Sequence, residues 1–396
     1  MVDNRPVEVT AAGHICLDII PKFPDNAGKT IADIMRPGKL VNVEEATVST
    51  GGPVSNTGIA LAILGMQVQF VTQVGDDYFG QAIISRLEKS GHSDGVTIAK
   101  GQHSSYTIVI APPGIDRIFL HNPGTNNTFT SESVDIELVK RSKVFHLGYP
   151  PLMRALYAND GEELMKTFRK AKSAGATTSL DMSLPDPTSE SGRANWDLIL
   201  QKTLPYVDMF LPSIEEGMFM NRKDRYMELH KQTSGAEILD LLKGSDYTQL
   251  ADAFLSYGAR MVGLKSAHRG WYLKTGSKDR LAEMGPARPA DIDSWANREM
   301  WCSAYHVEKI ASATGSGDSS IAGFLAAYLR AEPIQRCLLF ANCVGSHNVR
   351  VLDALSGIKT WEETAATVEA NPQQNGLDPQ TPGWQWDSQW RMWVKA

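Results

Sequence analysis

The sequence predicts an α/β protein with a central, mostly parallel sheet flanked by helices. Short apolar runs with strand character alternate with amphipathic stretches such as residues 160–174. This alternation implies crossover connections, which join parallel strands and place helices over the sheet. The expected strands cover residues 7–20, 68–75, 143–150, 177–183, 207–213 and 259–266.

Two segments interrupt this rhythm. Residues 21–48 are rich in Pro, Gly and Asp, and residues 103–122 have the pattern of a hairpin around a Pro-Pro-Gly-Ile-Asp turn. We expect a small β lid, built from about 21–50 and 103–122, outside the main sheet. The predicted organisation is one α/β domain over residues 1–370, followed by a Trp-rich tail over residues 371–396.

The tail contains Trp384, Trp386, Trp390 and Trp393. Indole rings carry large apolar surfaces that are usually packed against other groups. We therefore expect the tail to place its indoles against the body of the protein or against a neighbouring subunit.

Composition narrows the class of function. The chain has 396 residues and a net charge of −6, and it contains no long Lys/Arg run, which argues against a nucleic-acid partner. Its four cysteines are too few for a disulfide framework. No signal-peptide pattern and no run of 18 apolar residues is evident, so we expect a cytoplasmic protein that acts on a small molecule away from membranes.

The strongest local signal is Ala313-Thr314-Gly315-Ser316-Gly317-Asp318, which a helical run follows at once. A glycine-rich turn that opens a helix directs backbone N–H groups and the positive end of the helix dipole at one point, where a phosphate can bind. A carboxylate there would repel the phosphate unless it takes a proton from an attacking hydroxyl. The structural alternative is that Asp318 only caps the helix.

A second signal is Gly51-Gly52-Pro53-Val54-Ser55-Asn56, which also precedes a helix of small residues. Paired glycines expose backbone to a ligand, and the Asn56 amide can both donate to and accept from a polyol. Asp18 ends the first expected strand, where open α/β sheets commonly place ligand-binding groups. A solvated carboxylate at a strand end is the alternative interpretation of Asp18.

Together these elements resemble the ribokinase or PfkB family of carbohydrate kinases. They occur in the family's order, and the resemblance covers nearly the whole chain up to about Ile358. The resemblance implies a ribokinase-like fold and ATP-dependent phosphorylation of a sugar hydroxyl. The matching positions are Asp18 for the sugar-binding aspartate, Gly51, Gly52 and Asn56 for the first signature, Gly124-Thr125-Asn126 for a Gly-Ala-Asn element, and Thr314 to Asp318 for the second signature.

By the same resemblance, Asp318 is the catalytic base, and the amides of Gly315, Ser316 and Gly317 form an anion hole. The nucleotide is expected near Thr314, Asn342 and His347. Lys265-Ser266-Ala267 stands where the family commonly has Thr-Leu-Gly, and a lysine there could reach the ATP phosphates directly. The alternative interpretation of Lys265 is a surface lysine at a strand end. The family's Asn-x-x-Glu element appears as Ser213-Ile214-Glu215-Glu216, which leaves Glu216 as the residue linked to Mg²⁺. A monovalent cation and a homodimer formed through the lid are further features that the resemblance allows.

Two departures concern the sugar. Cys16 and Gly148 stand where ribose-phosphorylating members have an asparagine and an acid that touch the sugar. Their absence predicts a roomier, less polar pocket beside Gly148 and poor use of ribose compared with a hexose, a sugar acid or a nucleoside.

Other functions fit less well. Gly28-Lys29-Thr30 lacks the first glycine of a P-loop, and Gly315-x-Gly317-x-x-Ser320 lacks the third glycine of a dinucleotide fingerprint. The nine histidines form no metal-hydrolase motif. A catalytically weak sugar or nucleoside sensor with the same fold is the main alternative, and intact Asp318 argues against it.

Overall fold

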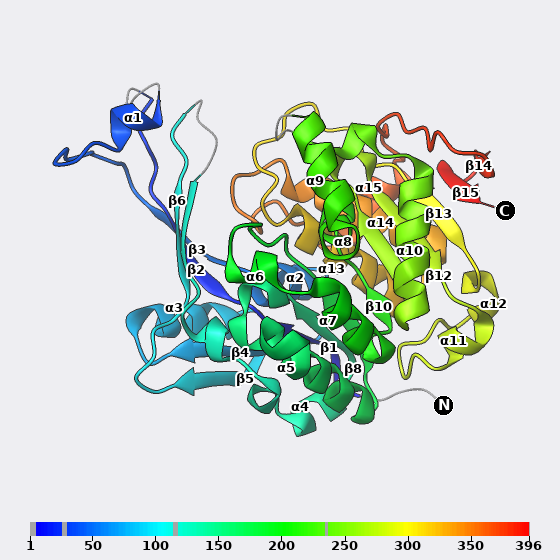
Figure 1. Ribbon diagram of the computed structural model, residues 1–396, viewed down its shortest axis with the longest axis horizontal. Helices are drawn as coiled ribbons and strands as arrows, with labels where there is room; N and C mark the ends of the chain where they lie inside the picture. Colours follow the sequence, from blue (N-terminus) through cyan, green and yellow to red (C-terminus); the bar gives the residue numbers. More distant parts are fainter. Residues whose placement is uncertain (1–4, 26–29, 114–117, 234–236, 396) are drawn as a thin grey trace.

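The predicted α/β fold is confirmed: a large sheet lies between two layers of helices, and a small second sheet projects from it (Figure 1). The structure is a computed structural model that describes residues 5–25, 30–113, 118–233 and 237–395. Within that part, the large sheet has the order β14-β15-β13-β12-β11-β10-β9-β8-β1-β4-β5. From β11 to β5 all neighbours are parallel, and from β11 to β14 they are antiparallel.

The strands of the large sheet are β1 (Val7–Gly13), β4 (Val68–Gly75), β5 (His92–Ala99), β8 (Ser142–Gly148), β9 (Thr177–Asp181), β10 (Met209–Phe210), β11 (Met261–Lys265), β12 (Trp271–Thr275), β13 (Glu299–Cys302), β14 (Trp384–Asp387) and β15 (Met392–Lys395). The α-helices are α1 (Ile31–Ile34), α2 (Pro53–Ile63), α3 (Tyr78–Leu87), α4 (Ile136–Lys140), α5 (Arg154–Ser173), α6 (Glu190–Arg193), α7 (Trp196–Thr203), α8 (Ile214–Asn221), α9 (Lys223–Gln232), α10 (Gly244–Tyr257), α11 (Lys278–Ala282), α12 (Ile292–Trp295), α13 (Ser316–Leu329), α14 (Ile334–Asn348) and α15 (Trp361–Glu369).

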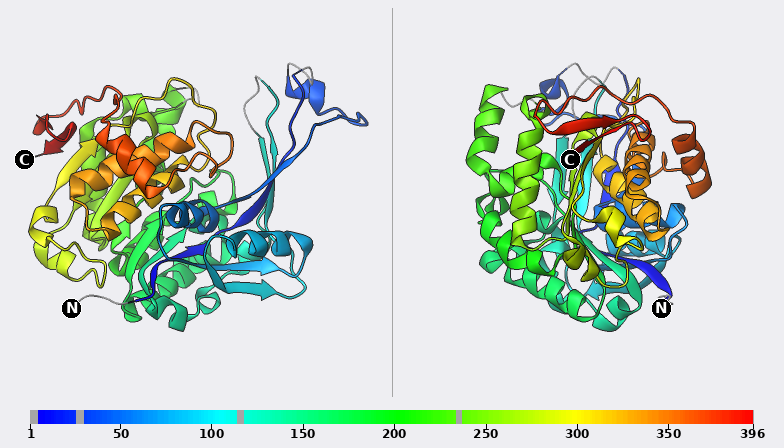
Figure 2. Two further views of the ribbon diagram at one scale, coloured as in Figure 1. Left: turned by 180° about the vertical axis from the view of Figure 1, so that it is seen from behind. Right: turned by 90° about the vertical axis from the view of Figure 1, so that its right-hand side faces the viewer.

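Each face of the sheet has its own hydrophobic core. Alternate residues of one strand point to opposite faces, so Ala11 of β1 packs with α2, α13 and α14, whereas Ala12 packs with α5, α7 and α10. The two helical layers are visible on either side of the sheet in the right-hand view of Figure 2. Burial on both faces explains why these strands appear in the sequence as nearly continuous apolar runs.

The lid is the second sheet, with the order β3-β2-β6-β7. Its strands are β2 (Cys16–Ile20), β3 (Thr47–Gly51), β6 (Tyr106–Ile110) and β7 (Ile118–Asn122). The predicted hairpin is confirmed, because β6 and β7 pair antiparallel. Residues 114–117 of its turn, and Gly28 and Lys29 of the rejected P-loop, lie outside the described residues. Figure 2 shows the lid standing away from the helical layers.

The prediction of one strand over residues 7–20 is wrong. The segment forms β1 of the large sheet and β2 of the lid, because the chain changes direction at Gly13, where φ is +110°. The Asn126 side chain fixes this junction by donating to the carbonyl of Ile15 (2.8 Å) and accepting from its N–H (3.3 Å). Asp18 therefore lies in the middle of a lid strand and does not end a strand of the main sheet.

The lid joins the body at close backbone contacts that only glycine permits. A Cβ atom on Gly13 would lie 2.6 Å from the carbonyl oxygen of Gly148, and one on Gly52 would lie 2.6 Å from that of His14. At the third junction a Cβ on Gly124 would lie 2.5 Å from the carbonyl oxygen of His103. All three glycines have positive φ, which other residues rarely adopt.

The Trp-rich tail extends the large sheet beyond β13. Met300 pairs with Val394 and Trp301 with Trp393, and β14 then pairs with β15. The ring of Trp384 lies 6.1 Å from that of Trp301, so this indole packs on the body of the same chain, whereas Trp386 is exposed. In the part of the chain that the structure describes, no helix has the length and apolar character that crossing a bilayer requires.

Candidate active site

The glycine-rich turn of the second signature borders a cavity at the carboxyl ends of the parallel strands. The cavity has a volume of about 240 Å³. Its walls come from five places, namely the end of β9, the end of β11, the start of α8, the residue after β8, and the turn before α13. Among the lining residues are Tyr149, Asp181, Ser213, Glu215, Glu216, Lys265, Gly315, Ser316 and Gly317. This is the edge of an α/β sheet at which ligands usually bind.

Helix α13 starts at this cavity. Gly315 is its N-cap, with φ of 76° in the left-handed region, and no side chain caps the first turn. The N–H of Ser316 donates to the carbonyl of Ala313 at 3.2 Å, so one of the three predicted anion-hole amides already has a partner. The helix dipole still favours negative charge at this end.

Asp318 lies in the first turn of α13 and is almost fully buried. Its Oδ2 atom accepts hydrogen bonds from the Asn56 amide (2.9 Å) and the Tyr149 hydroxyl (2.8 Å), while the Thr57 hydroxyl is 3.4 Å from Oδ1. Burial raises the pKa of the Asp318 carboxyl, and the bonds from Asn56 and Tyr149 oppose that rise. The carboxylate is thus fixed through one oxygen, which leaves the other lightly engaged.

Lys265 ends β11 and is buried, so the alternative of a surface lysine is wrong. Its ammonium group forms an ion pair with Asp181 and donates to the carbonyl of Leu211 at 2.6 Å. Burial alone lowers the pKa of Lys265, but the carboxylates of Asp181 and Glu216 outweigh it and raise the pKa. A Cβ on Gly317 would lie 3.9 Å from the Lys265 Nζ atom, which places the positive charge beside the glycine-rich turn.

Glu216 and Ser213 form a capping box at the start of α8. The Glu216 carboxylate accepts from the Ser213 N–H (2.6 Å), and the Ser213 hydroxyl accepts from the Glu216 N–H (3.1 Å). Burial raises the pKa of Glu216, and Lys265 opposes the rise. Burial and nearby carboxylates raise the pKa of the adjacent Glu215 to about 6. Two carboxylates therefore border the cavity opposite the turn.

The first-signature residues connect the lid to this cavity. A Cβ on Gly51 would lie 2.4 Å from Oδ2 of Asp18, so this glycine lets the carboxylate approach the backbone of β3. Gly52 follows as the N-cap of α2, whose first turn contains Asn56 and thus reaches Asp318. Burial raises the pKa of Asp18, and a hydrogen bond from Cys16 opposes the rise.

The prediction of open space beside Gly148 is wrong. A Cβ at this position would lie 2.5 Å from two ring carbons of Pro53. The Pro53 ring fills the volume, because α2 begins directly against the end of β8. Gly148 is therefore a packing contact, and it offers no room for a bulkier substrate.

Asn342 and His347 lie on α14 and are outside the set that lines the cavity. The Asn342 amide donates to the carbonyls of Cys302 and Ser303 at 3.0 and 3.1 Å, which ties α14 to the end of β13. Burial lowers the pKa of His347 to about 4. Thr314 donates its N–H to the Ser312 hydroxyl (3.1 Å) within the loop before α13.

Sequence reasoning missed three residues of the site. Tyr149 and Thr57 hydrogen-bond to Asp318, and Asp181 pairs with Lys265. The signal for Asp181 was its place at the end of an expected parallel strand. Tyr149 follows the end of β8 in the left-handed conformation (φ 65°), and nothing in the local pattern indicates that turn.

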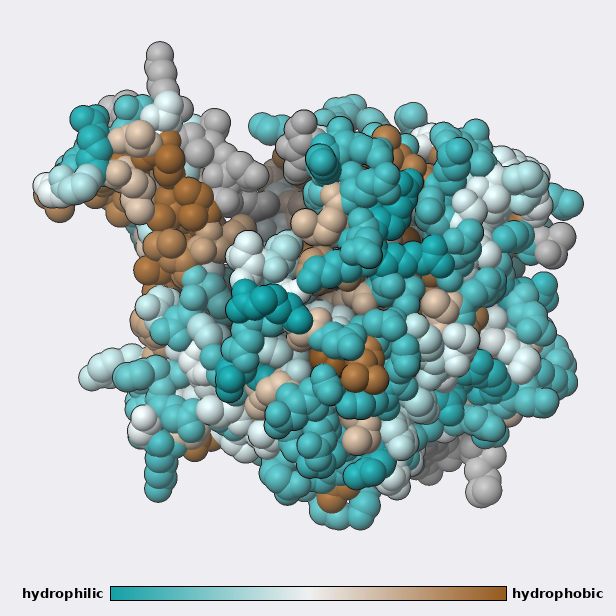
Figure 3. Space-filling model, viewed as in Figure 1, coloured by the Kyte–Doolittle hydropathy of each residue, from teal (hydrophilic) through white to brown (hydrophobic). Residues whose placement is uncertain are grey.

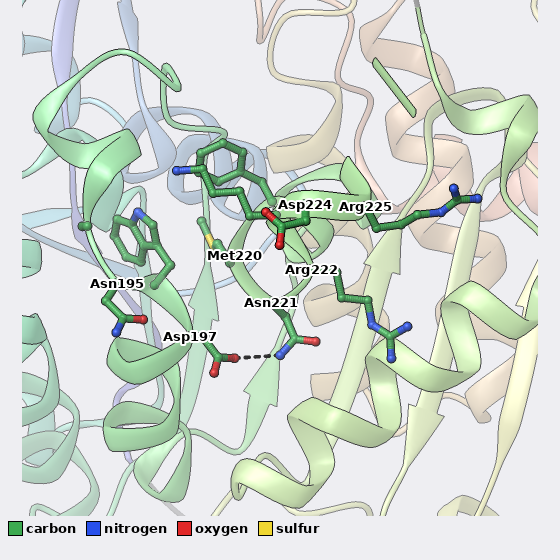
Figure 4. Close-up of a pocket in the computed structure, with 11 residues that line it drawn as sticks. Asn195, Asp197, Met220, Asn221, Arg222, Asp224 and Arg225 are labelled. Atoms are coloured by element: carbon green, nitrogen blue, oxygen red, sulfur yellow. Dashed lines mark hydrogen bonds between the residues drawn. The ribbon is translucent and has the colours of Figure 1, made fainter. Parts of the chain in front are cut away.

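A larger groove of about 530 Å³ lies on another part of the surface, where α7 faces the junction of α8 and α9 (Figure 4). Its polar side chains are engaged with protein groups: Asn221 donates to Asp197 (2.7 Å), Arg222 to Gln249 (2.8 Å) and Arg225 to Glu228 (2.8 Å). In Figure 4 Arg222 and Arg225 both extend toward the right of the view, and their guanidinium groups do not meet. The groove lacks the converging charges of the smaller cavity.

Comparison with known proteins agrees with this geometry. The family model described as pfkB family carbohydrate kinase matches residues 9–361. An uncharacterized sugar kinase of Archaeoglobus fulgidus is 23% identical over 301 residues, which cover 76% of this chain and 98% of the relative.

Solved structures show the same fold. Arabidopsis thaliana ribokinase complexed with ribose and ATP superposes with a TM-score of 0.68 at 17% identity, covering 92% of this chain and 99% of that chain. A putative ribokinase II from E. coli in complex with ATP and Mg²⁺ gives a TM-score of 0.65 at 18% identity, covering 92% and 100% of the two chains.

Proposed function

Because the chain belongs to the pfkB family of carbohydrate kinases, we propose that it transfers the γ-phosphoryl group of ATP to a hydroxyl of a sugar or sugar-like molecule. The observation that supports this most is the buried Asp318 carboxylate, held by Asn56 and Tyr149 beside a glycine-rich helix start. A carboxylate kept out of water and fixed in orientation is suited to general-base catalysis.

In this mechanism Asp318 takes the proton of the attacking hydroxyl. Since Asn56 and Tyr149 both donate to Oδ2, the substrate hydroxyl would donate to Oδ1. Asp18 would hold other hydroxyls of the substrate from the lid side, where its carboxylate lies against Gly51. Closure of the lid would exclude water, which otherwise competes as the phosphoryl acceptor.

The triphosphate would occupy the cavity beside Gly315 and Gly317. The positive end of α13 and the ammonium of Lys265 both favour its negative charge there. Lys265 is engaged by Asp181, so contact with a phosphate would exchange or share that ion pair. Asn342 contributes by positioning α14, since its amide is occupied within the protein.

The carboxylates that border the cavity fit a magnesium site. Mg²⁺ prefers oxygen ligands and usually keeps several waters, and Glu215 and Glu216 offer such oxygens. When bound, the ion would neutralise charge on the transferring phosphoryl group. Glu216 is held by Ser213, so it would act in a fixed orientation.

We also propose a cytoplasmic homodimer that pairs through the lid. The side chains of β7 are exposed, among them Ile118 and Leu120, and this strand is an edge of its sheet. Figure 3 shows apolar side chains gathered over the lid strands. An exposed apolar edge strand favours pairing with another chain.

The decisive experiment is an ADP-release assay of wild-type protein and Asp318→Asn with a panel of sugars, sugar acids and nucleosides. The amide keeps the shape but cannot accept the proton, so kcat should fall by roughly 10²- to 10⁴-fold. Asp94→Asn, at an exposed position on β5, is the matched control and should leave kcat unchanged.

A variant that keeps more than about a tenth of wild-type kcat would exclude Asp318 as the base. Binding of ATP and sugar without ADP release by the wild-type protein would favour a sensor instead of an enzyme. Cys16 replaces the asparagine of ribose-phosphorylating members, so ribose should show a low kcat/KM within the panel.

A further inference from the structure

Three side chains with metal-binding atoms meet where the lid joins the body. His14 lies between β1 and β2, Cys16 begins β2, and His121 lies on β7. Each offers one ligand atom within 4.8 Å of the atoms offered by the other two. His14 and Cys16 are two residues apart, and the pairing of the lid strands brings the distant His121 beside them.

His14 is the residue that points to a ligand. Its side chain is almost fully buried, and neither ring nitrogen has a hydrogen-bond partner in the structure. A buried polar group without a partner costs free energy, so such groups are rare unless a ligand or a water completes them. The centroid of the His121 ring lies 5.4 Å from that of the His14 ring, so the two imidazoles are neighbours.

The surroundings of Cys16 and His121 form a consistent hydrogen-bond chain. The Thr107 hydroxyl lies 3.0 Å from Nδ1 of His121 and 3.6 Å from Sγ of Cys16. In one tautomer of His121, Nδ1–H donates to the Thr107 hydroxyl, and this hydroxyl donates to the Cys16 sulfur. The Nε2 atom of His121 then keeps a lone pair that can bind a metal ion. Metal-ligating histidines are commonly oriented in this way through their other ring nitrogen.

We propose that His14, Cys16 and His121 bind one zinc-class divalent ion at the root of the lid. Two imidazole nitrogens and one sulfur form a borderline-soft donor set, which suits Zn²⁺ and related ions and is unlike the oxygen ligands that Mg²⁺ requires. Binding converts the Cys16 thiol to a thiolate and releases its proton to solvent.

The fourth position of a tetrahedral ion is available to a carboxylate. The Cys16 thiol donates to Oδ1 of Asp18 at 3.2 Å, so this oxygen already lies next to the sulfur ligand. Zinc–ligand distances are about 2.0–2.3 Å, so the cluster must contract slightly around the ion. The contraction would tie β2 and β7 to the segment that leaves β1, and it would restrain the lid.

Cobalt(II) is the probe, because a thiolate bound to Co²⁺ gives a charge-transfer absorption that shows sulfur coordination directly. The full chain, first freed of metal with a chelator and then dialysed, is titrated with Co²⁺ alone. We expect one ion per chain, the thiolate band, and loss of that band when Zn²⁺ is added.

Variants assign the ligands. Cys16→Ser should abolish the thiolate band, and His14→Ala or His121→Ala should weaken Co²⁺ binding by at least about tenfold. Cys337→Ser, at another buried cysteine, and His92→Ala, at an exposed histidine, are the matched controls and should behave as wild type. His121 is exposed, so its variant gives an answer even if the buried positions do not tolerate change.

Absence of the thiolate band in the wild-type chain, or an unchanged band in Cys16→Ser, would overturn the proposal. An unchanged Co²⁺ affinity in His121→Ala would also overturn it. These measurements do not use kinase activity, so they are independent of the proposed function.

One consequence does rest on the proposed function. If Asp18 both completes the metal site and holds the sugar, Zn²⁺ should raise the sugar KM and leave the ATP KM unchanged. Cys16→Ser should remove this inhibition, and persistence of the inhibition in that variant would contradict the shared use of Asp18.

Discussion

The cavity in the body and the lid of this protein differ in how completely the protein itself satisfies their side chains. Around the cavity, Asp318, Lys265 and Glu216 are buried or half-buried and each has protein partners. In the lid, β7 is exposed along its length, and at the root His14 is buried with no partner. The lid's own core is a small cluster that contains Phe23, Ile34 and Ile110.

This difference indicates which part of the molecule is ready before a ligand arrives. The Asp318 carboxylate, which we propose as the base, is already held in place by the folded body, so its orientation should need little reorganisation during the reaction. The lid has an exposed edge strand and a buried, unpartnered His14, which are the features on which we base the proposed dimer and metal site. Substitutions in the body should therefore change stability and chemistry, whereas substitutions in the lid should change binding and association.

The largest effect is expected for Lys265→Met. Removal of the ammonium leaves Asp181 as a buried, unpaired carboxylate, which should lower the free energy of unfolding by about 3–5 kcal/mol. Urea denaturation measures the loss. The double variant Lys265→Met/Asp181→Asn removes both charges and should recover much of the stability. Equal stabilities of the single and double variants would show that the ion pair is not the cause.

The next effect concerns His146, buried in β8. Burial, with Lys265 nearby, lowers its pKa from 6.5 to about 3, so the folded state keeps the ring neutral while the unfolded state takes up a proton. The stability that comes from keeping His146 neutral is fully present above pH 6.5, the pKa of the ring in the unfolded chain. It is lost progressively as the pH falls toward about 3, the pKa of the ring in the folded chain. Between pH 7 and pH 5 it should cost about 2 kcal/mol.

The comparison is made with His146→Gln, which can still hydrogen-bond to the hydroxyl of Ser179. Urea midpoints of the variant should decline less steeply than those of the wild type over the same pH range. Parallel declines would mean that another group controls acid stability.

A smaller effect is expected for Tyr149→Phe. The hydroxyl donates to Asp318 and helps to keep its pKa down, so its loss should raise that pKa further. The base must be ionised, so the acidic limb of the kcat/KM profile should move to higher pH, with less than about a tenfold loss well above the limb. An unshifted limb with a uniformly lower rate would indicate a purely structural role for the hydroxyl.

The smallest effect on stability is expected in the lid. Leu120→Ser changes an exposed side chain of β7 and should alter the free energy of unfolding by less than about 0.5 kcal/mol. If β7 pairs with a second subunit, sedimentation velocity should nevertheless show a shift toward monomer. Ser93→Ala on β5, outside the lid, is a control that should leave association unchanged.

The sequence predicted the body better than the lid, for a physical reason. Strands covered on both faces produce continuous apolar runs, and the turn before α13 is a local pattern of glycines and Asp318. The division of residues 7–20 between two sheets depends on contacts of Gly13 and Asn126 with residues distant in sequence. The pattern of apolar residues along the sequence does not indicate contacts between residues that are distant in sequence.

The site shows the same limit. Asp318 and Asn56 are part of recognisable motifs, and the structure joins them by a hydrogen bond. Two other features depend on how α2 meets β8. One is the hydrogen bond from Tyr149 to Asp318, and the other is the Pro53 ring that fills the space at Gly148. The bonds from Asn342 to two carbonyls at the end of β13 also depend on how α14 packs on the sheet, which the sequence does not show.

The three junction glycines restrict how the lid can move. Gly13, Gly52 and Gly124 sit at three of the four places where the chain passes between the body and the lid, and a Cβ atom at each would clash with backbone. A rotation of the lid would have to change the backbone at these junctions together, so we expect the four paired strands to move as one body. A small rotation at the junction glycines would then give a larger displacement at the end of the lid that is far from the body.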